Sequence, residues 1–557
     1  MNNINPANTS QWLKTLIGIV VLLNFSGLFV TIMAPDGALY ATIAKSMVLR
    51  NNYIDLFAEG HDWLDKPHFP FWMAALSFKC FDFTTWAYKL PAILFLMLGA
   101  VYTYLFAKKL YNQEVALWAV LILLTAEHIV ISNTDVRAEP YLTGLIIAAV
   151  YHFYRAHTQK QMSQLVIACL FAACAVMTKG LFALIPIVGA LGGEMIIKRQ
   201  WKQLFSWRWL VAAIFILLFI LPELYCLYSQ FDLHPEKTVF GQHNVSGIRF
   251  FFWDSQFGRF FNTGPIKGHG DPFFFVHTTL WAFLPWSLLL FAGIFQFIKT
   301  NRRQVQSAEW YCICGFGLTF LVFSASKFQL PFYTNIIFPF YAIITAAYLY
   351  SVTNGKSLRA IQIVQNVIVA LMVLLLIVLQ YYFRPDSFSW LTGVLLIALL
   401  ALMIFLPGSV AAVGYQKIAI RTVLAAVIVN TYLNLAFYPS LLKYQSGSEA
   451  AVWINDHNPS NLPVVQCIHV NDYGYPLEFY LDRPLYTIDE KGVGKLPSRP
   501  FLMYAYPDNI QFLKTKGWQI EPVKSFDRYW ITRLKPAFLD AKTRKGTLEQ
   551  VDLVVVR

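Results

Sequence analysis

Apolar stretches of about 20 residues, the length of helix that crosses roughly 30 Å of hydrocarbon, recur through the first 440 residues of this chain. Thirteen stretches have this character, at residues 12–33, 88–107, 115–132, 139–155, 162–178, 180–197, 208–229, 271–298, 308–325, 332–350, 358–382, 389–406 and 417–438. Charged residues make up only 13% of the chain, about half their share in soluble domains, which excludes a soluble protein. The sequence therefore predicts a polytopic α-helical membrane protein.

Lysine and arginine gather in every second turn between these stretches. The basic turns hold Lys108, Arg155, Lys198, Arg302, Lys356 and Lys417, each with a second basic residue nearby. Because short basic loops stay in the cytoplasm, we expect the N-terminus inside. Residues 34–87, 133–138, 230–270, 326–331 and the tail then lie outside, together with most acidic residues that precede the tail. The net charge of +13 follows from this topology and is no sign of nucleic-acid binding, and any chemistry is expected on the outer face.

The tail differs in character from the rest of the chain. After a transmembrane domain of residues 1–440, residues 441–557 form short β-rich runs separated by Gly, Pro and Asn, with a helical stretch near 508–516. The predicted strands cover residues 464–470, 476–481, 501–506, 528–534 and 552–557. This pattern predicts a soluble α/β domain on the outer side. It contains no phosphate-binding loop and no nucleophile elbow, so a lid or packing role is favoured.

The first outer loop, residues 34–87, carries the most informative polar residues. Asp36 stands at the outer end of the first span, where it is either a functional acid or a helix N-cap. Further along, the aromatic run 69–72 predicts a helix that lies in the headgroup layer. It is preceded by Trp63, Asp65 and Lys66.

Three more positions lie at the outer ends of spans. Glu139 opens the fourth span, and an acid at such depth marks either a functional site or a local ion pair with Arg137. Lys179 stands between two apolar spans with no acid beside it in sequence, so a snorkelling lysine is the simpler interpretation. Lys327 and Tyr333 lie at the mouth of the ninth and tenth spans, where tyrosine also belongs to the aromatic belt.

The order and spacing of these pieces resemble a known family. The matching pieces are residues 36–41, 63–67, 88–91, 137–142, 178–180, 259–273 and 327–333 with Pro339. On them the chain resembles the GT-C glycosyltransferases of the protein O-mannosyltransferase type, in the bacterial branch that includes the lipid A aminoarabinose transferase. The thirteen spans and the exported α/β tail are also similar to that branch.

The resemblance implies transfer of a sugar from an undecaprenyl-phosphate donor to a lipid, such as a lipid A-like acceptor, on the periplasmic side of a bacterial inner membrane. It implies that Asp36 is the general base for an acceptor hydroxyl, whereas an acceptor phosphate, already ionised, would need mainly alignment. It also implies that Glu139 is a second acid that positions the acceptor or the donor sugar. The groups implied to bind the donor phosphate are Lys66, Lys179, Arg259, Lys327 and Tyr333, and Tyr40, Trp63 and His269 complete the pocket. No cofactor is required, although some members carry a divalent ion, which would here bind at Asp65.

Departures from the family pattern concern the substrates more than the reaction. Gly37 replaces a second acid, Leu39 stands where the lipid A branch tends to carry arginine, and Ser255 and Gln256 replace an expected Glu-His pair. Two alternatives remain. A polyprenyl-lipid flippase or transporter would show internal repeats and midplane charges, and we find neither pattern. A protein O-glycosyltransferase or oligosaccharyltransferase on the same scaffold would differ in its acceptor.

Overall fold

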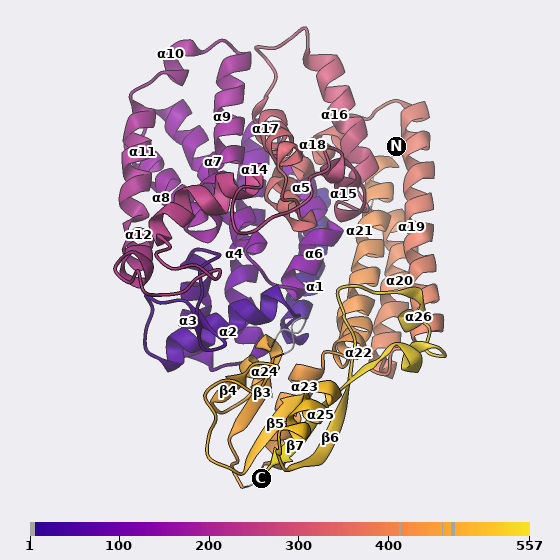
Figure 1. Ribbon diagram of the computed structural model, residues 1–557. Helices are drawn as coiled ribbons and strands as arrows, with labels where there is room; N and C mark the ends of the chain where they lie inside the picture. Colours follow the sequence, from indigo (N-terminus) through magenta and orange to yellow (C-terminus); the bar gives the residue numbers. More distant parts are fainter. Residues whose placement is uncertain (1–5, 411–413, 459, 469–473) are drawn as a thin grey trace.

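The computed structural model describes residues 6–410, 414–458, 460–468 and 474–557. Figure 1 shows a large helical body formed by the first part of the chain, with a small β-sheet at one end formed by the C-terminal part. Within the described residues, eight helices are long and apolar enough to cross a membrane. They span Gln11–Phe29, Thr85–Leu110 (α4), Met162–Lys179 (α8), Trp201–Phe219, Pro331–Ser351, Gly355–Phe383 (α19), Trp390–Val410 (α20) and Gly414–Leu442. The protein is a multi-pass membrane protein.

Bent pairs and shorter helices complete the helical body. The pair α5 (Gln113–Thr125) and α6 (Glu127–Thr134) bends by 53°, and the pair α15 (Phe274–Ala282) and α16 (Ser287–Asn301) bends by 118°. The other helices named below are α7 (Glu139–Gln159), α9 (Ile185–Ile197), α11 (Arg208–Phe219), α12 (Leu221–Leu227), α17 (Tyr311–Ala325) and the 3-10 turn η5 (Pro331–Ile337), which leads into α18 (Phe338–Ser351). Each of the thirteen predicted stretches falls mainly on helical residues, but residues 115–132 and residues 271–298 each form a bent pair of helices instead of one straight span.

The first outer loop folds into two helices and a hairpin. Helix α2 (Asp36–Leu49) is followed by the short strands β1 (Phe57–Ala58) and β2 (His61–Asp62) and by the apolar helix α3 (Phe69–Phe81). Asp36 is the first residue of α2, Pro35 is the N-cap, and no side chain caps the helix. The interpretation of Asp36 as an N-cap is therefore wrong, and its carboxylate is available for other contacts.

The C-terminal sheet has five strands in the order β4-β3-β5-β7-β6. Strand β3 (Val464–Cys467) runs parallel to β4 (Leu485–Ile488) and β5 (Phe501–Ala505), and β7 (Glu549–Val556) runs antiparallel to β5 and to β6 (Ile520–Arg528). The accompanying helices are α23 (Ser446–His457), α24 (Tyr475–Tyr480), α25 (Pro507–Thr515) and α26 (Pro536–Leu539). The tail is thus an α/β unit, as predicted.

Two of the predicted strands are wrong. Residues 476–481 lie largely in helix α24, and residues 528–534 begin where β6 ends. The strand predicted at 464–470 ends at Cys467, and its last two residues lie outside the described part of the chain.

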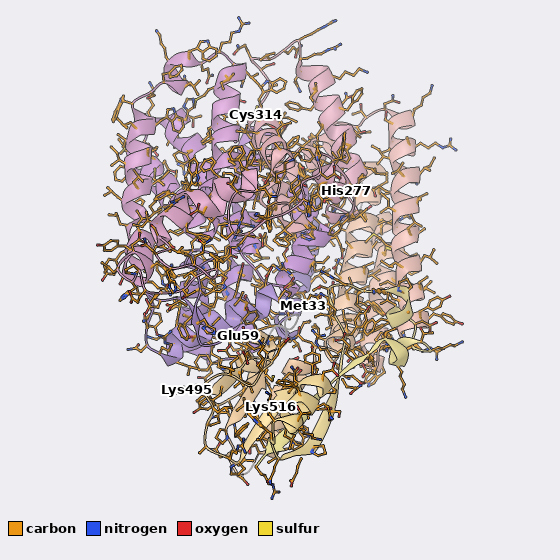
Figure 2. The ribbon with its side chains drawn as sticks, in the orientation of Figure 1. Met33, Glu59, His277, Cys314, Lys495 and Lys516 are labelled. Carbon is orange, nitrogen blue, oxygen red and sulfur yellow. The ribbon has the colours of Figure 1, made fainter. Side chains whose placement is uncertain are left out.

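The sheet domain holds the segment that leads into Asp36. Gln445 accepts a hydrogen bond from the Ala34 amide at 2.8 Å and donates one to the Ile32 carbonyl at 2.9 Å. The Ile32 amide donates to the Tyr480 hydroxyl at 2.9 Å. Figure 2 shows Met33 and Glu59 at this boundary between the helical body and the sheet. The position of Asp36 therefore depends on residues more than 400 positions away in the sequence.

Candidate functional site

A cavity with an empty volume of about 890 Å³ lies where the first outer loop meets α8, α12 and η5. We call it the cationic cavity. Four of the predicted phosphate-binding residues line it, namely Lys66, Lys179, Arg259 and Tyr333. Asp65 also lines it, and phenylalanine and leucine side chains supply much of the remaining wall. The sequence places these groups up to 267 positions apart, and the fold brings them together.

Lys66 and Arg259 meet on one carboxylate. Asp65 forms ion pairs with both, so the two cations stand side by side on the cavity wall. Arg259 opens the short helix α14 (Arg259–Phe261), and its guanidinium lies 5.4 Å from the centre of the Phe328 ring. Because two cations share one acid, the wall keeps an excess of positive charge.

Lys179, the last residue of α8, forms an ion pair with Glu139, the first residue of α7. The Lys179 ammonium also lies 3.9 Å from the centre of the Tyr333 ring. Glu139 is only 2% exposed, so this ion pair is shielded from water. The interpretation of Lys179 as a lone snorkelling residue is wrong, because its partner is 40 residues away and not adjacent in sequence.

The turn after Lys179 requires glycine. Gly180 has a φ of +89°, which L side chains rarely adopt, and a Cβ atom there would stand 2.3 Å from the Gln256 amide nitrogen. Gln256 donates to the Lys179 carbonyl at 3.1 Å and accepts from the Phe182 amide at 3.2 Å. Gln256 therefore fixes the turn that carries Lys179, and it lines the cavity itself.

Asp36 belongs to a second charged cluster. Arg137 forms ion pairs with both Asp36 and Asp135, and its guanidinium lies 4.6 Å from the centre of the Phe332 ring. The predicted local pair between Arg137 and Glu139 does not form in this arrangement, because each residue pairs with a different partner. The Phe332 ring also lies 5.5 Å from the Lys179 ammonium, so this ring connects the two clusters.

The electrostatics of Lys66 link the two clusters. Burial alone would lower the pKa of its ammonium, but neighbouring acidic groups outweigh burial and raise the pKa above its ordinary value. These groups are the Tyr40 and Tyr333 hydroxyls and the carboxylates of Asp36 and Glu139. Lys66 therefore remains a cation at neutral pH, within the electrostatic reach of both predicted acids.

The remaining predicted residues lie around the cavity without lining it. Tyr40 and Trp63 pack edge to face on each other, with ring centres 6.2 Å apart, and both contact Phe71. They support the loop that carries Lys66. Lys327 and His269 are exposed and are not lining residues, although Ser326 and Phe328 on either side of Lys327 do line the cavity.

The chemistry around Asp65 does not fit a bound metal ion. Its two carboxylate oxygens are each engaged by a cation, Arg259 on one and Lys66 on the other. Among the residues that the structure describes, no group of three or more His, Cys, Asp or Glu side chains could hold a metal ion. No step of the chemistry below depends on a metal.

A second cavity, the junction cavity, lies between the start of α2 and the C-terminal sheet and has an empty volume of about 510 Å³. Ala34 and Pro35, the two residues before Asp36, form part of its wall. The other walls carry amide, hydroxyl and aromatic groups, among them Gln445, Ser446, Gln466, Tyr504, Tyr529, Trp530 and Thr532, together with Arg528. Gln466 is 2% exposed, and its side-chain oxygen has no hydrogen-bond partner among the described residues.

Comparison with known proteins gives a consistent assignment. A family model described as dolichyl-phosphate-mannose-protein mannosyltransferase matches residues 65–226. An uncharacterized protein of Aquifex aeolicus is 24% identical over 98% of this chain and 99% of its own length. An undecaprenyl phosphate-alpha-4-amino-4-deoxy-L-arabinose arabinosyl transferase of Edwardsiella ictaluri is 28% identical over 58% of this chain and 57% of its own length. The chain therefore spans little more than half of the length of that transferase.

The fold matches over nearly the whole chain. The crystal structure of ArnT from Cupriavidus metallidurans bound to undecaprenyl phosphate has a TM-score of 0.74 at 16% identity and covers 98% of both chains. The chain therefore has the GT-C fold of ArnT, and its sequence is similar to that of transferases of the ArnT and protein mannosyltransferase group. This similarity agrees with the resemblance read from the sequence motifs.

The sequence motifs do not assign the roles that three residues have at this site. Arg137 holds Asp36, Gln256 fixes the Lys179 turn, and Glu223 lines the cationic cavity and contacts His68. A signal exists for Arg137, because an arginine between two acids at the outer end of a span must pair with at least one acid. For Gln256 and Glu223 the sequence offers only a polar residue in an apolar segment.

Proposed function

We propose that this protein transfers a sugar from an undecaprenyl-phosphate donor to a lipid acceptor on the periplasmic side of a bacterial inner membrane. The observation that carries this proposal is the convergence of Lys66, Lys179, Arg259 and Tyr333 on one largely apolar cavity. A polyprenyl-phosphate sugar combines an apolar chain with one phosphodiester, which is what apolar walls with a cationic patch can hold. The similarity to transferases named for an undecaprenyl-phosphate sugar supports the same donor class.

The cations have a role in the bond-breaking step. When the bond between the anomeric carbon and the phosphate oxygen breaks, the electron pair stays on the phosphate, which leaves as a monoester with an additional negative charge. Lys66, Arg259 and Lys179 stabilise this developing charge, and groups already oriented by Asp65 and Glu139 need little reorganisation. Tyr333 can donate a hydrogen bond to the same phosphate.

Asp36 acts as the general base toward the acceptor. A hydroxyl that attacks the anomeric carbon gives its proton to a carboxylate within hydrogen-bond reach, and the side chain of Asp36 is 39% exposed and therefore accessible. Arg137 orients this carboxylate. One displacement forms the new carbon–oxygen bond as the bond to phosphate breaks, so the configuration at the anomeric carbon inverts. Glu139 positions a substrate through Lys179.

The junction cavity supplies a route for the acceptor. It adjoins Pro35 directly, and its amide, hydroxyl and aromatic groups can hydrogen-bond and stack on sugar rings. This lining favours an acceptor that presents a saccharide head group, such as a lipid A-like glycolipid.

The test is Asp36→Asn in the full-length protein. We expect transfer from undecaprenyl-phosphate aminoarabinose to lipid A to fall by about 10²- to 10⁴-fold, because the variant lacks the base. Binding of undecaprenyl phosphate should stay within about twofold of wild type, since the phosphate-binding cations remain. Transfer is measured in proteoliposomes with a radiolabelled donor sugar.

Asp62→Asn is the matched control, because Asp62 lies in the same outer loop and pairs with Lys237 away from both cavities. It should retain transfer. If Asp36→Asn keeps full transfer, Asp36 is not the base. If wild type moves the donor lipid across vesicles without transferring sugar, the protein is a transporter. Transfer to peptides instead of lipid A would assign the alternative acceptor class.

A further inference from the structure

A third cavity, which we call the far-end cavity, lies at the opposite end of the helical body from the C-terminal sheet. It is enclosed by α7, α8, α11 and the short helix α10 (Trp201–Leu204), and it has an empty volume of about 900 Å³. Figure 1 shows α10 at the end of the molecule farthest from the strands. It shares no lining residue with the cationic cavity or the junction cavity.

The lining of the far-end cavity carries positive charge and no carboxylate. Lys160, Lys202, Arg208 and His157 line it, together with Gln203, Ser206 and apolar residues. The chain contains no Asp or Glu between residues 155 and 162 or between 198 and 208. Within the described part of the chain, no ion pair engages Lys160, Lys202 or Arg208. An anion in this cavity would therefore meet several cations and no competing acid.

Arg208 is fixed in place and is not merely a surface residue. Its guanidinium donates to the Ala156 carbonyl at 3.0 Å and to the Lys160 carbonyl at 2.6 Å, at the C-terminal end of α7. Lys160 has a φ of +56°, which is uncommon for a residue other than glycine. The Trp209 ring nitrogen donates to the Gln203 carbonyl at 2.9 Å, which ties α11 to α10. The basic groups thus lie on a preformed wall.

Exposed apolar side chains stand next to lining residues of this cavity in the sequence. Trp201, Phe205, Trp207 and Leu210 have exposed fractions of 50%, 81%, 65% and 67%. Tryptophan at such positions marks the boundary between headgroups and hydrocarbon. Exposed tryptophans beside a basic cavity favour a lipid phosphate over a free phosphate ion as its ligand.

We propose that the far-end cavity binds the headgroup of an anionic phospholipid, with its phosphodiester between Lys160, Lys202 and Arg208. Basic pockets between transmembrane helices on the cytoplasmic side are known to suit such headgroups. This site is independent of the proposed transfer reaction. It concerns the membrane in which the protein works and not its substrates.

The test compares two variants that remove the same charge. Lys160→Gln/Lys202→Gln removes two cations from the cavity, and the control Lys356→Gln/Lys417→Gln removes two exposed lysines from other turns predicted on the same side. Each protein is purified in full length and equilibrated with nanodiscs of phosphatidylcholine containing phosphatidylglycerol. Retained phosphatidylglycerol is counted by native mass spectrometry, and the thermal unfolding midpoint checks folding.

We expect the cavity variant to retain phosphatidylglycerol about tenfold more weakly than wild type, and the control to match wild type. Equal retention in both variants would overturn the proposal. The last experiment is a competition between inorganic phosphate and phosphatidylglycerol. If it displaces phosphatidylglycerol at equal concentration, the site binds a soluble phosphate and the lipid assignment is wrong. If the cavity variant unfolds early, Lys202→Gln alone gives the same comparison.

Discussion

The cationic cavity and the junction cavity differ in the chemistry of their walls. The cationic cavity is built by the outer loop and helices of the membrane part, and its polar groups are mainly charged. The junction cavity is built largely by the C-terminal sheet domain, and its polar groups are mainly amides and hydroxyls. Charge suits an anionic leaving group, whereas neutral hydrogen-bonding groups suit a saccharide.

This difference gives the C-terminal domain a role beyond covering the site. Gln445 belongs to the link before α23, lines the junction cavity and also holds the backbone of Ile32 and Ala34. The same part of the chain therefore contributes to the wall of the junction cavity and to the position of Asp36. The lid or packing role favoured by the sequence stays a prediction, and an acceptor role for this domain rests on the proposed function.

The largest difference between donor binding and acceptor binding is expected for Lys66→Gln. A hydrogen bond to a charged group contributes about 1.5–3 kcal/mol, so undecaprenyl phosphate should bind about 10- to 100-fold more weakly. The KM for the acceptor should stay within about twofold of wild type, because Lys66 lines only the cationic cavity. Binding is measured by titration of purified protein with undecaprenyl phosphate.

Lys237→Gln is the matched control, since Lys237 pairs with Asp62 at 2.9 Å and lines neither cavity. If Lys66→Gln raised the acceptor KM and left donor binding intact, the roles of the two cavities would be reversed.

A smaller effect is expected for Gln466→Leu in the junction cavity. One neutral hydrogen bond contributes about 0.5–1.5 kcal/mol, so the acceptor KM should rise about two- to tenfold while donor binding is unchanged. The thermal unfolding midpoint should stay close to that of wild type, because the side-chain oxygen that is removed lacks a partner among the described residues and leucine is of similar size. Steady-state transfer kinetics and thermal unfolding measure the two quantities.

Gln519→Leu changes an exposed glutamine immediately before β6 and is the control for the change of side chain. A Gln466→Leu variant that loses stability and activity together would indicate a structural role only, and the junction cavity would then not be an acceptor site.

The helical part of the fold could be predicted because its signal is local. Apolar runs of about 20 residues identify helices without knowledge of their neighbours. The strands of the C-terminal sheet were harder to predict than the helices. Residues 476–481 have an apolar pattern that suits a strand or a short buried helix, and the structure has α24 there. Strand β6 has mostly exposed residues and contains Pro522, so it lacks the alternation that marks a strand.

The site could be predicted in part, for a related reason. The cationic cavity is lined by four residues that belong to the matching sequence motifs, namely Lys66, Lys179, Arg259 and Tyr333. Their partners could not be assigned, because an ion pair between residues 40 or 194 positions apart leaves no local trace. Lys327 is a different case, because its side chain is exposed while its neighbours Ser326 and Phe328 line the cavity at a bend of the chain.

The smallest expected effect is a pH dependence of stability and donor binding, which arises at the cationic cavity alone. Glu223 lines that cavity, and its buried carboxylate contacts the His68 ring at 3.0 Å, while the other ring nitrogen donates to the Ile54 carbonyl at 2.8 Å. Burial alone would lower the pKa of His68, but the Glu223 carboxylate outweighs burial and raises it above 6.5. The stability contributed by the charged pair is therefore fully present below about pH 6.5 and is lost as the pH rises through the raised folded-state pKa.

We expect His68→Gln to flatten this pH dependence, because glutamine cannot take up the proton. Unfolding midpoints measured from pH 5 to pH 9 should fall with rising pH in wild type and change less in the variant. The exposed His61→Gln, in the same loop, should behave like wild type. Donor binding should follow the same trend while the acceptor KM does not, since Glu223 lines the cationic cavity and not the junction cavity. An acceptor KM that moved in step with donor binding would mean that the two cavities respond as one unit, and the distinction between them would fail.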